Sequence, residues 1–164
     1  VPTPAPTVTS GDTMPHSILW SFVLTLHLVS IIMWVGGGAY AAVVLRPSLN
    51  LLDQTQRNSV HLQTMARFFK GLTHAIPTAL ITGWLLVLHE GGFANAPWTT
   101  NVMQLLGLTM AVLFARMYMG TYQKLRRAIR PQPSGFDSVR KQVLLIVALG
   151  ILAVLSACLG HPFV

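Results

Sequence analysis

Four long apolar stretches, separated by short polar segments, dominate the pattern of hydrophobic and polar positions along the chain. They cover residues 17–45, 68–89, 101–122 and 142–160. An α-helix needs about 20 apolar residues to cross about 30 Å of hydrocarbon. The pattern therefore predicts an all-α integral membrane protein, with a four-helix transmembrane bundle over residues 17–164.

The ends of these stretches coincide with residues that interrupt helices. Arg46 and Pro47 follow the first stretch, and two glycines follow the second, in which Pro77 is expected to cause a kink. Residues 49–63 are polar and amphipathic and predict a connecting loop with a short interfacial helix. A Pro/Ser/Gly linker is expected at residues 131–135. The opening residues 1–16, rich in proline and threonine, predict a flexible periplasmic tail.

The composition supports lipid as the solvent of most of the surface. Of the 164 residues, 52% are hydrophobic and 9% are charged, whereas soluble domains carry about a quarter charged residues. The net charge of +7 comes from basic residues that are not interleaved with exposed aromatic residues, which argues against a nucleic acid partner.

The basic residues also predict the orientation of the bundle. All eleven lysines and arginines lie within residues 46–70 and 116–141. Cytoplasmic loops of membrane proteins retain positive charge. We therefore expect these two connections in the cytoplasm, and both termini and the connection at residues 90–100 on the periplasmic side.

Two histidines, His27 and His74, lie inside predicted spans. Ionisable groups within a membrane are costly and mark functional sites. Two imidazoles at similar depth on neighbouring helices could ligate the iron of haem b. Arg67, Lys70 and Arg116, near the cytoplasmic edge, could then bind the haem propionates.

On the first stretch, His27 shares a seven-residue repeat with Trp20, Trp34 and Ala41. Seven residues are about two helical turns, so this stripe should face protein. It meets the run of glycines at residues 36–38, which allows a helix or a flat cofactor to approach the backbone closely. Helix packing alone explains the same stripe equally well.

Three further histidines, His16, His89 and His161, lie at the outer ends of predicted spans. With Glu90 and Asp12 they could bind copper or zinc, because imidazole and carboxylate suit both metals. Helix ends also carry histidines without any metal, and no closely spaced ligand pair occurs.

Methionines recur every seven residues on the third stretch, at Met103, Met110 and Met117, with Met33 on the first. Thioethers bind Cu(I), so this row could pass copper. Packing is the favoured interpretation, because methionine fills irregular gaps between helices. The predicted spans contain no paired carboxylates, and the sequence has no P-loop or CxxC motif, so no hydrolytic or phosphoryl-transfer activity is predicted.

The first stretch resembles the first helix of the copper-resistance D (CopD) family and of the related HemJ-type protoporphyrinogen oxidases. The residues that carry the resemblance are His27, Trp34-Val-Gly36-Gly37, Tyr40 and Leu45-Arg46-Pro47, with a looser likeness at Arg67-Phe68-Phe69, Thr82-Gly83 and Trp98. The resemblance implies a small multi-helix protein of the bacterial inner membrane. The HemJ-type likeness implies that His27 corresponds to a haem b ligand, whereas the copper-resistance likeness implies a role in copper handling. Tyr118-Met119 replaces the Tyr-His pair of the HemJ-type proteins, so their oxidase activity is not implied.

Three functions are therefore expected, in this order. The first is a membrane b-type cytochrome-like protein, either an electron-transfer subunit or a small quinone-linked oxidoreductase, with His27 and His74 as haem ligands. The second is copper transport or delivery across the inner membrane. The third is a structural accessory subunit of a respiratory membrane complex. Expected partners are the lipid bilayer and redox or membrane-complex proteins, with a quinone as a possible small partner.

Overall fold

The computed structural model describes residues 14–128 and 133–160. Within these two ranges the chain is helical apart from short turns, and no strand occurs. Four helices, Ser17–Leu51, Gln54–His89, Trp98–Arg127 and Ser134–Leu159, are long and apolar enough to cross a membrane. The prediction of an all-α bundle with four membrane-spanning helices is confirmed.

The first and third spans are not uniform α-helices. The first consists of α1 (Met14–Ile31), the π-helix η1 (Ile32–Gly36), α2 (Gly37–Tyr40), the π-helix η2 (Ala41–Leu45), α3 (Arg46–Ser48) and the 3₁₀-helix η3 (Leu49–Leu51). The third consists of α5 (Trp98–Arg116), the π-helix η4 (Met117–Tyr122) and α6 (Gln123–Arg127). The second span is α4 (Gln54–His89), and the fourth is α7 (Pro133–Leu159).

The connecting loop predicted within residues 49–63 is shorter in the structure, and the predicted short helix is the start of a long one. After the short turn at Leu52 and Asp53, α4 begins at Gln54 and continues through Pro77 to His89. No glycine or proline interrupts its first four turns, and Met65 is buried in the core, with Leu62 packed against it. The amphipathic pattern is therefore that of a helix packed on protein, and not that of a loop.

The fourth span also begins earlier than the predicted boundary at residue 142. Its helix starts at Pro133, where the absence of a proline N–H costs nothing because the first helical N–H groups have no partner within the helix. Phe136 and Val139, in its first two turns, are buried. The predicted linker at residues 131–135 therefore lies partly in a helix, with 131 and 132 outside the described residues. Of the predicted tail, residues 1–13 lie outside them too.

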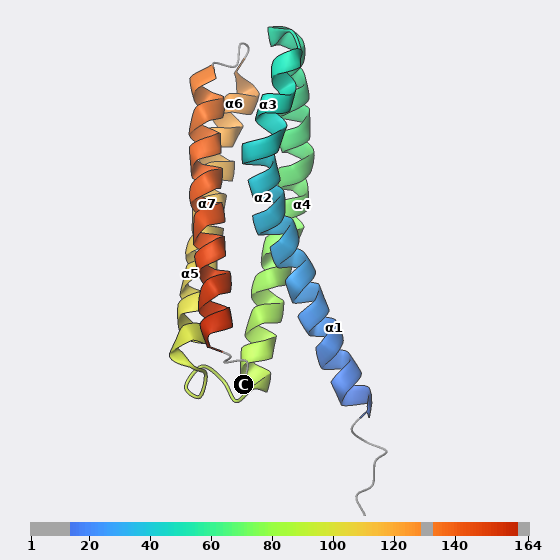
Figure 1. The fold of residues 1–164 in the computed structure, drawn as a ribbon, viewed down its shortest axis with the longest axis vertical. Helices are drawn as coiled ribbons and strands as arrows, with labels where there is room; N and C mark the ends of the chain where they lie inside the picture. The colour runs from blue at the N-terminus through green and yellow to red at the C-terminus, as the bar shows by residue number, and fades with distance from the viewer. Residues whose placement is uncertain (1–13, 129–132, 161–164) are drawn as a thin grey trace, which may run out of the picture.

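The helices pack as two pairs (Figure 1). Along its length α5 lies beside α7, and α1 lies against α4, whereas α4 and α5 share few contacts. The two pairs are joined where α2 and its flanking π-helices pack on α7. Towards its N-terminus α1 diverges from the other helices, the outer half of α4 included (Figure 1), and outside its own span its contacts are mainly with α4.

The described chain begins and ends at the same end of the bundle, where the 90–97 turn also lies (Figure 1). We call this the outer end, and the end that carries α6 and the start of α7 the inner end. The core cluster lies mainly towards the inner end, with Trp34, Phe69, Phe114, Met117 and Val143 among its members. The turn after α4 contains Gly91 and Gly92 at φ +107° and +85°, in the left-handed region that the sequence-predicted helix end requires.

Candidate functional site

The His27 imidazole is fixed against α4 by its Nδ1 atom. Nδ1 lies 2.9 Å from the carbonyl oxygen of Ala79 and 3.1 Å from Oγ1 of Thr82. Because a carbonyl can only accept, Nδ1 carries the proton and donates it. In the neutral imidazole the other nitrogen, Nε2, then has a free lone pair. His27 thus has the tautomer of a histidine that ligates a metal through Nε2.

This position depends on the small residue Gly83. A Cβ atom placed on Gly83 would lie 2.9 Å from Cε1 of His27, closer than a Cβ atom normally approaches another atom. Thr82 is buried, and its hydroxyl donates to the Thr78 carbonyl at 2.6 Å. The Thr82-Gly83 pair therefore provides both a hydrogen-bonding oxygen and the space for the imidazole. The sequence pattern indicated Thr82 and Gly83 only through the loose likeness to the copper-resistance and HemJ-type families.

The second predicted ligand, His74, lies elsewhere on α4. Its Nδ1 is 3.0 Å from the Lys70 carbonyl, one turn earlier in the same helix, and the side chain is exposed. Its Nε2 is therefore also free to accept. His74 precedes Ala79 by five residues, which is about 140° around the helix. The structure does not bring the two imidazoles together, because His27 lies against Ala79 while His74 points from a different side of α4.

The cations predicted to bind propionates separate in the same way. Arg67 and Lys70 are both exposed on α4. Arg116, at the end of α5, instead borders a hollow between α5, η4 and α7. The structure therefore places Arg116 in the other helix pair, away from the two α4 cations.

At the outer end, the His89 ring stacks on Trp20 with the centroids 3.7 Å apart and the planes 12° from parallel. This contact joins α1 to the end of α4. His161 and the side chain of His16 lie outside the described part of the structure. Within that part, no three His, Cys, Asp or Glu side chains lie close enough to hold a metal. The outer metal site stays a prediction.

Two methionines of the seven-residue row are buried as the packing interpretation predicts, whereas Met119 is 70% exposed. Met110 and Met117 are 3% and 1% exposed and belong to the core cluster. The Met33 methyl group packs against Gly71 of α4, and the Met110 methyl group packs against Gly150 of α7. These side chains fill gaps between different pairs of helices.

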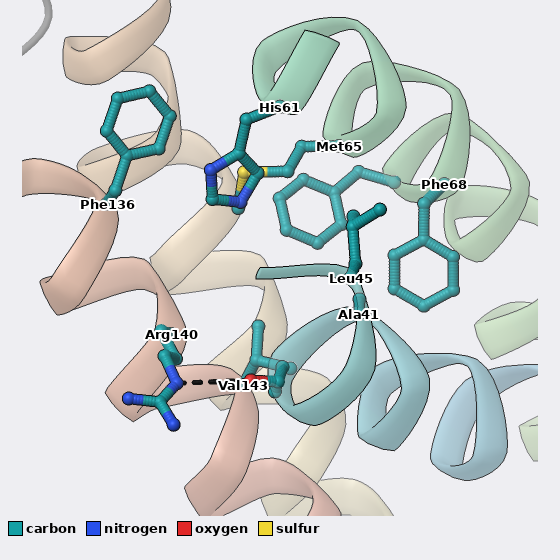
Figure 2. A pocket seen from close by; sticks show the side chains of 10 residues that line it. Ala41, Leu45, His61, Met65, Phe68, Phe136, Arg140 and Val143 are labelled. Atoms are coloured by element: carbon teal, nitrogen blue, oxygen red, sulfur yellow. Dashed lines mark hydrogen bonds between the residues drawn. The ribbon is translucent and has the colours of Figure 1, made fainter. Parts of the chain in front are cut away.

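A small pocket that the sequence did not indicate lies near the inner end (Figure 2). The His61 ring stacks on Phe136 with centroids 4.7 Å apart, so His61 is not in a free loop. Nε of Arg140 donates to the Ala42 carbonyl at 3.1 Å. Figure 2 shows the Phe136 ring facing His61 across the pocket, and Arg140 lower on the same helix with its bond across to the first span. The accessible volume is about 20 Å³, enough for about one water molecule.

The Arg140 bond has a local cause in the sequence. Ala42 lies in the π-helix η2, where a carbonyl pairs with the N–H five residues later. The fifth residue after Ala42 is Pro47, which has no N–H. Arg140 supplies a donor to this carbonyl from α7. The pocket is therefore bordered by a hydrogen bond that joins the two helix pairs.

One buried polar atom at the centre of the bundle lacks a partner. Nε1 of Trp34, in η1, makes no hydrogen bond with any described residue, although the side chain is only 4% exposed. Around it lie apolar side chains such as Phe68, Phe69 and Leu72. An unpaired buried donor costs about 1–3 kcal/mol. A hydrogen-bond acceptor entering the bundle would be stabilised at this point.

The fold defines a multi-pass α-helical membrane protein. Comparison of the chain with protein-family models found no match. Comparisons with curated proteins and with solved structures found no match either.

Proposed function

We propose that this chain is a b-type cytochrome-like electron-transfer subunit of the bacterial inner membrane, in which His27 is an axial ligand of haem b. In the proposed orientation both termini lie in the periplasm, in accordance with the basic residues of the two other connections. One observation carries the proposal. The His27 imidazole lies within a membrane span and donates Nδ1–H to the Ala79 carbonyl, which leaves Nε2 unprotonated.

This arrangement fits a metal ligand better than a packing contact. Ligating histidines are usually oriented by a hydrogen bond from the second ring nitrogen to a backbone carbonyl or carboxylate. A packed histidine would bury both nitrogens or pair both, because an unpaired polar atom in hydrocarbon is costly. Haem bound at Nε2 would supply one-electron chemistry, and the chain would hold the imidazole in place through Ala79, Thr82 and Gly83.

The second axial ligand is proposed to be His74, whose Nε2 is free in the same way. Its position on α4, about 140° from Ala79, means that α1 would have to reorient against α4 before one haem could bridge the two side chains. The two ligand assignments are therefore tested separately, and His27 alone carries the haem proposal.

The test is an optical spectrum of the full chain, expressed with a haem supply and purified in mild detergent. The wild type should show a ferrous haem b Soret band, and His27→Ala should abolish it. His61→Ala removes an imidazole that stacks on Phe136 at the inner end and serves as the matched control, which should keep the band. His74→Ala should convert a low-spin spectrum to a high-spin one, or remove it, if His74 is the second ligand.

Two outcomes would refute the proposal. A haem band that survives His27→Ala would show that the iron lies elsewhere. A colourless wild-type protein that retains copper by elemental analysis would instead support copper transport or delivery. A band that survives His74→Ala unchanged would refute only the second ligand.

A further inference from the structure

A hollow that the sequence did not predict lies between α5, η4 and α7. Its accessible volume is about 460 Å³, and it is lined by Leu113, Arg116, Thr121, Gln142 and Leu145. This volume is in the range of small-molecule binding sites. We propose that the hollow binds the phosphate headgroup of an anionic phospholipid, with Arg116 as the principal ligand.

Three side chains that border the hollow keep donor hydrogens without a partner among the described residues: Arg116, Thr121 and Gln142. The Arg116 guanidinium is exposed and has no hydrogen bond or ion pair with any described residue. Gln142 donates one N–H to Oγ1 of Thr121 at 3.2 Å, which leaves its second amide hydrogen. A guanidinium, an amide and a hydroxyl are suited to the oxygens of a phosphate ester.

The Thr121 hydroxyl differs from four hydroxyls that bond to the backbone of their own helix. Those of Ser21, Thr25, Thr78 and Thr109 donate to the carbonyl four residues earlier. Thr121 accepts from Gln142 and donates to no described residue. Thr121 lies in the π-helix η4, whose backbone pairing differs from that of an α-helix. Its proton is therefore available to a ligand in the hollow.

The depth of Arg116 corresponds to a lipid headgroup. Trp98, at the outer end of the same span, is 74% exposed, as expected of a tryptophan at the membrane surface. Arg116 follows Trp98 by 18 residues, or about 27 Å at 1.5 Å per residue. The hydrocarbon core is about 30 Å thick, so the guanidinium reaches the phosphates of the opposite surface by extending its side chain.

The polar and apolar side chains that line the hollow lie at the depths expected for a lipid headgroup and its acyl chains. Leu113 precedes Arg116 by about one turn towards the outer end, and Leu145 follows Gln142 by about one turn in the same direction. The apolar residues thus lie deeper in the membrane than the three donors. A free phosphate ion would gain nothing from the leucines, whereas the acyl chains of a lipid would pack on them. Lys124 and Lys141, both exposed near this end, favour an anionic lipid over a zwitterionic one.

The test is native mass spectrometry of the full chain in detergent micelles that contain phosphatidylglycerol or phosphatidylcholine with the same acyl chains. Wild type should bind phosphatidylglycerol more tightly than phosphatidylcholine. Arg116→Gln should weaken phosphatidylglycerol binding about tenfold or more, because it removes a charge-assisted bond. Arg127→Gln, an exposed arginine outside the hollow, removes the same charge and should change binding about twofold or less.

If Arg116→Gln does not fold, the same lipid-binding measurement is made on Thr121→Val and Gln142→Leu. Each should weaken phosphatidylglycerol binding about threefold to tenfold by removing one neutral donor. Equal losses for Arg116→Gln and Arg127→Gln would overturn the proposal, since binding would then depend only on surface charge. Inorganic phosphate that displaces the lipid at equal concentration would overturn the lipid assignment in favour of a free-anion site. Neither outcome bears on the haem proposal.

Discussion

Replacing Gly83 by alanine tests the contact between α1 and α4 without any assumption about function. The new Cβ would lie 2.9 Å from Cε1 of His27, so the imidazole must shift, and we expect its hydrogen bond to the Ala79 carbonyl to weaken. Hydrogen bonds between membrane helices contribute about 0.6 kcal/mol on average and up to about 1.7 kcal/mol. Alanine in place of glycine within a helix gains about 1 kcal/mol. In the wild type the two effects should nearly cancel.

In a His27→Ala background the imidazole is absent, and the gain of about 1 kcal/mol from Gly83→Ala should appear in full. The double-mutant cycle should therefore show a coupling free energy of about 0.6–1.7 kcal/mol between the two positions. The assay is reversible unfolding in mixed detergent micelles, followed by helical circular dichroism. Gly107→Ala, where a Cβ meets no atom within 4 Å, is the control and should give the same gain in both backgrounds. Additivity within about 0.3 kcal/mol for Gly83 and His27 would refute the contact.

Three other predictions follow from packing and charge. Gly150→Ala should lower the free energy of unfolding by about 1–3 kcal/mol relative to Gly107→Ala, because its Cβ would lie 2.5 Å from Cγ2 of Val35; the same micelle unfolding assay measures it, and equal effects would contradict the close packing. Trp20→Ala should speed amide hydrogen exchange in the first turns of α1 but not in α2, because it removes the stack on His89 that ties the outer end of α1 to α4. A reporter fused after Val164 should be active in the periplasm, and activity confined to the cytoplasm would reverse the proposed orientation.

The membrane spans were predictable because length and hydropathy alone decide whether a helix can cross a bilayer. The helical conformation of the first turns of α4 could not be predicted in the same way. Its amphipathic pattern suits an interfacial segment as well as a packed helix, and the burial of Met65 against the other helices distinguishes them only once the fold is known.

The stripe on the first span was predicted correctly in part. Trp20 stacks on His89, His27 binds the Ala79 carbonyl and Trp34 is buried, so all three face protein. The pairing of His27 with His74 was inferred from their similar depths in the membrane, which can be estimated from position in the sequence. The direction in which each side chain points around its helix axis is much harder to predict from the sequence. Thr121 was missed because its hydroxyl becomes available only through the π-helix and the amide of Gln142.

The two π-helices of the first span determine which neighbouring helix the side chains of each half face. A π-turn contains one residue more than an α-turn, so η1 and η2 each shift the angular phase of everything before them by about 100°. Deleting one residue within Ile32–Gly36 would restore α-helical phase and rotate Trp20 and His27 together away from α4, while leaving α2 on α7. The direction in which His27 points is therefore set by the number of residues between α1, which packs on α4, and α2, which packs on α7. Insertions and deletions in η1, more than substitutions, are the changes that would redirect the outer half of this span to a different neighbour.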